Sequence, residues 1–479
     1  MTISEVTRKE ILEFCRGSPR HHGLYLTLCN VSVGRLRQAR LIVGLARRRV
    51  TMKVAPVAAT SCLGTTELIV DASQEGKHAA LWYPVALDLA ERGVKVGLVT
   101  SSRASPVDPR QQRELDKSPC VGYLVFPDRW TPSDHPSGDG IKGRMPTSLS
   151  GGLLGAAAEL LLRYAESLAD AGESLLSRTR ARAVVSTTPY SLWSHALLLA
   201  ARRLGIRTVC MQQGLPTLDC WTLPVCDTAI VWSQLGNQLL SQRGWVPEQV
   251  VVSRNPAIPT AETALALRHS RRRTLGLADN DFCVLFLGQV SSDMTFRVAG
   301  YIETCRMVGL GLSYAKRSRP VVVLLRPHYR DKRRETERAL RKDVPSIAVS
   351  QRTRLYDDIA AADVVISMYS TAMEEAYLMG RPIVQAVAEG CELGYDFRLL
   401  GAPLVRSSAE LARCLTNQDW IVGRPRPPIR RSVANEIRDM LDSKLPKAQV
   451  RVSAEDTSRH QDRHGNHPSL GRDNPSTMT

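Results

Sequence analysis

The sequence predicts an α/β protein made of two doubly wound domains, each built on a parallel sheet, that face a cleft. Short apolar runs of the kind that form buried parallel strands alternate with segments long enough to be helices. This alternation occurs twice along the 479 residues, on either side of a proline-containing break at residues 255–259. With 43% hydrophobic residues, the chain has enough apolar side chains to form two cores.

The first series of elements starts at residue 67 and indicates a domain over residues 61–255. Its predicted strands cover residues 67–72, 94–100, 121–126, 183–187, 207–211, 228–232 and 250–253. Its predicted helices cover residues 77–92, 153–178, 191–204 and 234–243. Residues 128–145 are rich in proline and glycine and therefore predict a loop.

The second series indicates a domain over residues 256–422. We expect an interdomain linker to run from the break into the basic residues 271–273. The predicted strands cover residues 282–287, 321–325 and 347–350, the predicted helices cover residues 295–316 and 330–341, and the unit at 352–384 closes the series. Residues 423–479 predict a C-terminal helix and then a polar, disordered tail that begins at about residue 448.

The clearest functional pattern lies in the unit that closes the second series. A predicted buried strand at residues 363–367 is followed by a polar turn with Ser370 and Thr371, either of which can cap the next helix. Glu374 and Glu375 fall in the first turns of that helix, where the helix dipole favours negative charge. The turn therefore joins the carboxyl end of a strand to the amino end of a helix, where α/β sheets bind phosphorylated ligands.

This unit resembles the nucleotide-binding signature of GT-B glycosyltransferases, including the branch that makes bacterial surface and capsular polysaccharides. The matching positions are Ser370, Thr371, Glu375, Ala376, Gly380 and Pro382. The resemblance implies a GT-B fold in which the Ser-Thr turn contacts the donor phosphate and Glu375 binds the ribose hydroxyls. The residue chemistry agrees, because a carboxylate accepts hydrogen bonds from a vicinal diol. An ordinary capped βαβ unit is the alternative interpretation, and it requires neither glutamate.

Two other strand ends are candidates for the donor site. Gly288 follows the predicted strand at 282–287 and precedes hydroxyl residues, a pattern that fits a phosphate-binding loop. Arg326 and His328 end the strand at 321–325, where the resembling families carry a cation and a histidine near the donor base or diphosphate. Arg326 would neutralise diphosphate charge as a metal does elsewhere, or else form an ordinary surface salt bridge. No Asp-x-Asp pair falls at a predicted strand end, so the sequence indicates neither a metal nor a cofactor.

The first domain supplies the candidate acceptor site. His78 lies at the start of the helix after the first predicted strand, and the GT-B resemblance implies that it is the general base for the acceptor hydroxyl. A helix-capping or surface histidine is the plainer interpretation, and Glu75 is a weaker candidate base. Gln213 and Gly214 follow a strand where capsule and glycerophosphate transferases carry His-Gly. An amide can orient a hydroxyl or a sugar, but it cannot act as a base.

The chain is basic, with 64 − 47 = 17 more lysine and arginine residues than acidic ones. Residues 1–60 concentrate this excess, since residues 1–53 contain eleven basic and three acidic side chains. This leader is either poorly ordered, a transit peptide, or a segment that anionic lipid attracts to a membrane surface. The charge suits nucleotide and lipid phosphates, whereas 5% aromatic residues and the lack of a base-stacking motif argue against nucleic acid.

The remaining composition predicts a cytoplasmic protein, which the leader would hold at the inner face of the membrane if anionic lipid attracts it. No apolar run reaches the roughly 18 residues that cross a bilayer, and no clean signal-peptide core is present. The eleven cysteines include no Cys-x-x-Cys pair, and several, such as Cys210 and Cys283, lie in apolar runs. We therefore expect reduced, buried thiols.

Together these patterns predict a metal-independent glycosyltransferase that moves a sugar from a nucleotide-activated donor to a glycan or lipid-linked acceptor. A UDP-N-acetylglucosamine 2-epimerase remains an alternative, because that family has a turn similar to Ser370 with Glu374 and Glu375. A polyol-phosphate transferase also remains, although Gln213 disfavours it. A third alternative is a non-catalytic polysaccharide-assembly adaptor, which is compatible with Gln213 and the basic leader.

Overall fold

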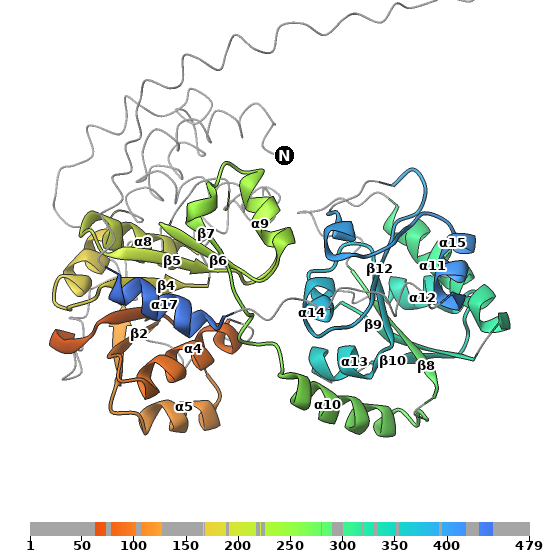
Figure 1. Ribbon diagram of the computed structural model, residues 1–479, viewed down its shortest axis with the longest axis horizontal. Coiled ribbons are helices and arrows are strands. Elements are labelled where there is room, and N and C mark those ends of the chain that lie inside the picture. The colour runs from red at the N-terminus through yellow and green to blue at the C-terminus, as the bar shows by residue number, and fades with distance from the viewer. Residues whose placement is uncertain are drawn as a thin grey trace, which may run out of the picture. The chain divides into compact units, whose positions relative to one another are not determined.

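The computed structural model describes residues 63–72, 78–101, 107–126, 166, 168–187, 191–216, 221, 226–278, 280–289, 300–318, 320–328, 334–350, 354–391, 395–417 and 431–443. They form one parallel sheet of seven strands and another of six, with helices packed on them (Figure 1). The predicted α/β class with two doubly wound sheets is confirmed. The predicted leader at 1–60, the loop at 128–145 and the tail from residue 448 lie outside the described residues.

The first sheet has the strand order β3-β2-β1-β4-β5-β6-β7. Its strands are β1 (Leu68–Asp71), β2 (Val96–Ser101), β3 (Val121–Phe126), β4 (Ala183–Ser186), β5 (Arg207–Met211), β6 (Thr228–Val231) and β7 (Val250–Val252). Its helices include α4 (Ala79–Glu91), α5 (Pro109–Asp116), α8 (Leu192–Arg203) and α9 (Gln234–Ser241). The chain winds from β1 to β3 and then returns to β4, so the direction of winding reverses between β1 and β4.

The second sheet has the order β10-β9-β8-β11-β12-β13. Its strands are β8 (Phe282–Leu287), β9 (Val321–Arg326), β10 (Ile347–Val349), β11 (Val364–Ser367), β12 (Ile383–Ala386) and β13 (Leu404–Val405). Its helices include α11 (Tyr301–Ser318), α12 (Glu335–Arg341), α13 (Leu355–Ala361), α14 (Ala372–Leu378) and α15 (Ser408–Thr416). Here the direction of winding reverses between β8 and β11.

The prediction of a linker that reaches residues 271–273 is wrong, because helix α10 (Ala261–Thr274) occupies most of that segment. The side chain of Thr260 caps this helix by accepting a hydrogen bond from the backbone N–H of Thr263. Glu262 lies in the first turn and three arginines lie in the last turn, which is the charge arrangement that a helix dipole favours. The basic run therefore ends a helix instead of forming a linker.

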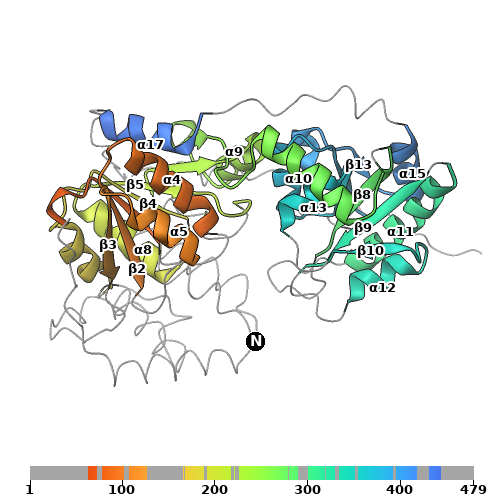
Figure 2. The same cartoon turned by 90° about the horizontal axis from the view of Figure 1, so that it is seen from below.

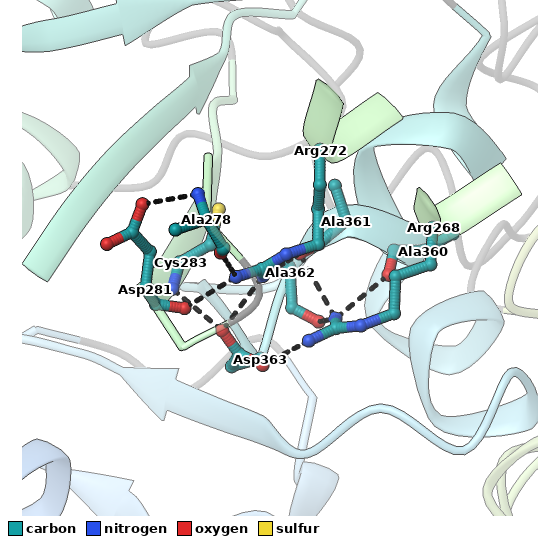
Figure 3. Close-up of polar contacts among 9 residues, drawn as sticks. All are labelled: Arg268, Arg272, Ala278, Asp281, Cys283, Ala360, Ala361, Ala362 and Asp363. Carbon is teal, nitrogen blue, oxygen red and sulfur yellow. Dashed lines mark hydrogen bonds and ion pairs between the residues drawn. The ribbon is translucent and has the colours of Figure 1, made fainter. Parts of the chain in front are cut away.

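Helix α10 packs against α13 of the second sheet (Figures 1 and 2). Two of its arginines, Arg268 and Arg271, contact residues of α13. Figure 3 shows Arg268 and Arg272 converging on Asp363, the residue before β11. Arg268 Nη2 lies 2.7 Å from Asp363 Oδ1, and Arg272 Nη1 lies 3.3 Å from Oδ2. The same carboxylate accepts the backbone N–H of Cys283 at 2.8 Å, which fixes the start of β11 beside β8.

The two arginines also satisfy backbone carbonyls that the end of a helix leaves without partners. Arg268 donates to the carbonyl oxygens of Ala360, Ala361 and Ala362 at the end of α13. Arg272, which is only 2% exposed, donates to the carbonyls of Ala361, Ala278 and Asp281 (Figure 3). These charges therefore hold α10, α13 and the first strand of the second sheet together.

The C-terminal helix predicted within 423–479 is α17 (Val433–Asp442), and it packs on the first sheet rather than on the second. Val433, Ile437 and Leu441 of α17 join the same apolar core as Trp82 and Leu89 of α4, and Figures 1 and 2 both show the two helices side by side. An isolated parallel β-bridge between Arg254 and Ser432 joins the residue just before α17 to the segment after β7.

The elements absent from the sequence prediction include the helices α5, α10 and α15 and the strand β13. The α5 helix is short and polar, and it begins at Asp108, whose carboxylate accepts the backbone N–H groups of Arg110 and Gln111. No helix in the described part of the chain is long and apolar enough to cross a bilayer. The described cysteines are all free thiols, and burial raises the pKa of Cys283 to about 12.

We expect Asp363→Ala to lower the free energy of unfolding by about 3 to 5 kcal/mol, because it leaves two largely buried arginines without their carboxylate. Denaturant unfolding followed by circular dichroism measures this loss. The matched control is Asp442→Ala, which removes a carboxylate from an exposed pair with Arg438 and should cost much less. Equal losses in the two variants would contradict a structural role for the Asp363 cluster.

Candidate functional site

The predicted donor residues come together at one edge of the second sheet. Gly288 follows β8, Arg326 and His328 stand at the end of β9, and Ser370 and Thr371 follow β11. These three strands are neighbours in the order β9-β8-β11, and all are parallel, so their carboxyl ends share one edge. The edge includes the reversal of winding between β8 and β11, which is where open α/β sheets bind ligands.

Gly288 is needed where the ends of β8 and β9 approach each other. Its N–H donates to the carbonyl of Arg326 at 2.8 Å. A Cβ atom at this position would lie 3.2 Å from Pro327 Cα and 3.3 Å from His328 N, both of which are backbone atoms. A larger residue would therefore push the two strand ends apart. The hydroxyl residues predicted to follow, 291 and 292, lie outside the described part of the chain.

Arg326 forms an ion pair with a carboxylate that the sequence did not single out for this role. Its Nη1 lies 2.6 Å from Oδ2 of Asp358, which is completely buried, while the Arg326 side chain is 27% exposed. Asp358 also pairs with Arg271 at 2.9 Å and accepts a hydrogen bond from Ser350. Two arginines share one carboxylate, so the three charged groups keep a net positive charge, part of it at the exposed side of Arg326.

The turn between β11 and α14 is held by one hydrogen bond within the turn and by another from β12. Ser370 Oγ accepts the backbone N–H of Ala372 at 3.3 Å, whereas the Thr371 side chain is exposed and makes no capping hydrogen bond. On the buried side, Gln385 donates to the carbonyl of Met368 at 2.9 Å. Thr371 thus occupies the N-cap position and is exposed, while Ser370 supplies the side-chain hydrogen bond at the start of α14.

The two adjacent glutamates of α14 have different environments. Glu374 is 2% exposed, and its carboxylate accepts hydrogen bonds from Gln212 Nε2 at 2.6 Å and from the hydroxyl of Ser233. Burial raises the pKa of Glu374 to about 7, although both hydrogen bonds act in the opposite direction. Glu375 is half-buried and lies near Tyr356, whose pKa is raised by burial and by this glutamate.

Glu374 therefore links the two sheets, and Glu375 remains the candidate for contact with a ribose. Gln212 follows β5, and Ser233 caps α9 by accepting the N–H of Gly236, so both partners of Glu374 belong to the first sheet. The Gln212 side chain also accepts the backbone N–H of Trp232 at 3.2 Å. Sequence reasoning did not assign this role to Glu374, since its partners are distant in the chain.

The predicted acceptor-side residues lie next to the donor-side turn. A Cβ atom built on Gly214 would be 3.7 Å from Thr371 Cγ2, which is ordinary contact. The next residue, Leu215, is 3% exposed and joins the apolar core of the second sheet. Gln213, the residue that follows Gln212, is half-buried. The loop after β5 is thus brought to the turn after β11, as a site shared by the two domains requires.

His78 lies at the reversal of winding in the first sheet. It immediately precedes α4, and its ring nitrogen Nδ1 lies 3.2 Å from Oγ1 of Thr187, which follows β4. Asp71, the last residue of β1, accepts hydrogen bonds from the hydroxyls of Ser186, at 2.8 Å, and Ser194. The alternative candidate, residue 75, lies outside the described residues. Among the described residues, no cluster of three or more side chains suited to a metal ion occurs.

Comparisons with known proteins agree with this architecture. No family model matches the sequence, and no curated protein matches it in a sequence search. Among solved structures, the UDP-GlcNAc 2-epimerase of Methanocaldococcus jannaschii is 14% identical, with 79% of this chain and 99% of that chain covered and a TM-score of 0.51. The UDP-GlcNAc 2-epimerase of Neisseria meningitidis, bound to UDP-GlcNAc, is 11% identical, with 79% of this chain and 99% of that chain covered and a TM-score of 0.49. MurG of Acinetobacter baumannii is also 11% identical, with the same two coverages and a TM-score of 0.44.

The two doubly wound sheets, together with the first of these likenesses, place the chain in the class of GT-B fold proteins. The resemblance carried by the turn at Ser370 and Thr371 is thereby confirmed at the level of the fold. At 14% identity the likeness concerns the fold, and the reaction has to be argued from the residues themselves.

We expect Glu374→Gln to flatten the dependence of stability on pH. The pKa of Glu374 rises from 4.5 to about 7 on folding, so the folded state favours the protonated form. The contribution of this protonated carboxyl to the free energy of unfolding is fully present below pH 4.5 and is lost as the pH rises through 7. The loss approaches about 3 kcal/mol at most, since one pKa unit corresponds to about 1.4 kcal/mol.

Unfolding free energies of the two proteins between pH 5 and about 8.5 test this expectation. Glutamine keeps the size of the side chain and can hydrogen-bond both Gln212 and Ser233, but it does not ionise. The wild-type protein should lose stability relative to the variant over this range. Profiles that run parallel would show that Glu374 does not change its charge there.

Proposed function

We propose that this chain is an enzyme, a GT-B glycosyltransferase that moves a sugar from a nucleotide-activated donor to a glycan or lipid-linked acceptor. The observation that carries the proposal is the convergence of Gly288, Arg326, His328, Ser370 and Thr371 at the carboxyl edge of the second sheet. Backbone N–H groups, hydroxyls and a cation at such an edge suit a diphosphate.

The donor would bind with its diphosphate beside the close approach of Gly288 and the end of β9. Thr371 would supply an exposed hydroxyl. Arg326 would supply positive charge, because Arg326 and Arg271 both pair with the single carboxylate of Asp358. Glu375 would accept hydrogen bonds from the ribose hydroxyls. The positive charge of Arg326 would stabilise the departing nucleoside diphosphate, the task that a metal performs in other transferases.

The acceptor would bind to the first sheet, on the side of Gln213, Gly214 and His78. Its hydroxyl oxygen forms a bond to the anomeric carbon, while the bond from that carbon to the diphosphate oxygen breaks and the diphosphate leaves with the electron pair. The proton of the hydroxyl passes to an oxygen of the departing diphosphate. The proximity of Gly214 to Thr371 supports a site to which both sheets contribute. Gln213 can orient the acceptor by hydrogen bonds.

The donor is a cytoplasmic metabolite class, so we place the reaction in the cytoplasm. The basic residues of the leader, which lie outside the described part of the chain, suit an anionic membrane surface where a lipid-linked acceptor would be presented.

Thermal stabilisation by nucleotides tests the donor site directly. We expect one of UDP, CDP, GDP, TDP or CMP to stabilise the full-length chain, by about 2.7 kcal/mol at 100 times its dissociation constant. Glu375→Ala should remove most of this effect, because the variant lacks the carboxylate proposed to hold the ribose. Glu389→Ala, which removes an exposed glutamate beyond β12, is the matched control and should respond like the wild type.

The absence of stabilisation by all five nucleotides would overturn the transferase proposal and favour a non-catalytic adaptor. If a nucleotide stabilises Glu375→Ala as much as the wild type, that result would contradict the ribose-binding role proposed for Glu375. Release of a nucleoside mono- or diphosphate in the presence of acceptor distinguishes a transferase from a 2-epimerase, whose product remains a nucleotide sugar.

A further inference from the structure

The polar side chains around His78 form two neighbouring networks where the first sheet reverses its winding. In one network, Asp71 accepts hydrogen bonds from Ser186 and Ser194. In the other, Thr187 contacts Nδ1 of His78 at 3.2 Å. Thr187 is 1% exposed and Asp71 is 3% exposed, whereas His78 is half-buried. The histidine is thus the member of this group that a ligand can approach.

The direction of the hydrogen bond between Thr187 and His78 decides what the histidine can do. If the Thr187 hydroxyl donates, Nδ1 carries a lone pair and the proton of the neutral ring is on Nε2. If Nδ1–H donates, Nε2 carries the lone pair and can take a proton from a substrate. The first tautomer is a hydrogen-bond donor at Nε2, and the second is a base there.

The burial of Thr187 favours the first direction. Because the side chain is 1% exposed, bulk water does not reach its hydroxyl. Among the residues that the structure describes, the acceptor in contact with this hydroxyl is Nδ1 of His78. A buried donor without an acceptor costs about 1 to 3 kcal/mol, whereas an unused lone pair on an oxygen is tolerated more often.

The surroundings of the ring point the same way. At Nδ1, the described partner is the Thr187 hydroxyl, whereas the histidine of a catalytic triad has a carboxylate that keeps a proton on this nitrogen and stabilises the charged imidazolium. His78 also precedes the 13-residue helix α4, so its ring lies near the amino end of that helix. A neutral imidazole in such a position can act as a hydrogen-bond donor.

We propose that Thr187 is a positioning residue that holds His78 as its Nε2–H tautomer, so that His78 donates a hydrogen bond to a substrate oxygen. The substrate group is an oxygen acceptor of a sugar or a phosphate. This role differs from the general base that the GT-B resemblance implies, and the proton of the acceptor hydroxyl then passes to an oxygen of the departing diphosphate. The identity of the ligand rests on the proposed transferase function, but the tautomer does not.

Nitrogen-15 NMR of the full chain labelled at histidine tests the tautomer without any ligand. Long-range correlations between ring protons and nitrogens separate protonated from unprotonated nitrogens, and His78→Gln identifies the signals of His78. At about pH 8, we expect an unprotonated Nδ1 and a protonated Nε2 in the wild type. Thr187→Ser, which keeps the hydroxyl, should preserve this pattern, and the isosteric Thr187→Val should shift it toward a mixture of tautomers.

A wild-type spectrum with a protonated Nδ1 and an unprotonated Nε2 would overturn the proposal. So would a Thr187→Val variant that folds normally by circular dichroism and leaves the nitrogen shifts of His78 unchanged. Because this experiment needs no nucleotide, its failure leaves the donor-binding test untouched, and a failed donor-binding test leaves the tautomer result standing.

Turnover of nucleotide sugars that carry the nucleotide found by thermal stabilisation gives a second readout. Glutamine supplies an N–H donor but no base, so we expect His78→Gln to lower kcat by less than about tenfold, the scale of one neutral hydrogen bond. Loss of a general base would lower it by about 10² to 10⁴-fold. His78→Ala, which removes the donor as well, should be slower than His78→Gln. Equal, large losses in both variants would contradict the donor role.

Discussion

The order of the strands is the constraint on which the candidate site depends. In each sheet the chain starts in the middle, winds to one edge and returns to wind the other way, so two neighbouring strands send their connections to opposite faces. The backbone and side chains at the carboxyl ends of these strands are then left accessible. In the first sheet this place holds Asp71, and it holds Thr187 in contact with His78. In the second sheet it holds Gly288 and the turn after β11.

Buried and half-buried carboxylates fix the elements that carry the site. Asp363 and Asp358 bind three arginines of α10 and one of β9, and they join this helix to α13 and to the second sheet. Glu374 connects α14 to the loop after β5 and to the cap of α9. The positive charge of the run at residues 271–273 is therefore directed largely inward, and it contributes less to the surface field than the sequence suggests. Arg326 alone among these arginines stands at the candidate donor edge.

Most of the fold could be predicted from the sequence, because a buried parallel strand has a nearly continuous run of apolar residues. The runs at β8 and β11 illustrate this, and so does the turn with Ser370 and Thr371 that follows. The helix α10 was missed because its low apolar content resembles that of a linker, and only the partners of its arginines reveal why it is helical and ordered. The short strand β13 has two residues, too few for any periodic signal.

The candidate site was predictable in its strand ends but not in its side-chain pairings. Glu374 and Glu375 are adjacent and chemically identical, and the sequence offers no means of telling which one is buried. The difference arises from Gln212 and Ser233, which lie 162 and 141 residues away along the chain. The contact of Thr187 with His78 spans 109 residues and is likewise invisible locally. Such pairings depend on the packing of whole elements, so they appear only in three dimensions.

The central claim is that the carboxyl edge of the second sheet binds a nucleoside diphosphate. A crystal structure of the full chain grown with the nucleotide that stabilises it most tests this claim most directly. We predict diphosphate density beside Gly288 and the turn of Ser370 and Thr371, with the ribose within hydrogen-bonding distance of Glu375. Nucleotide bound elsewhere on the chain, with this edge filled only by water, would contradict the account.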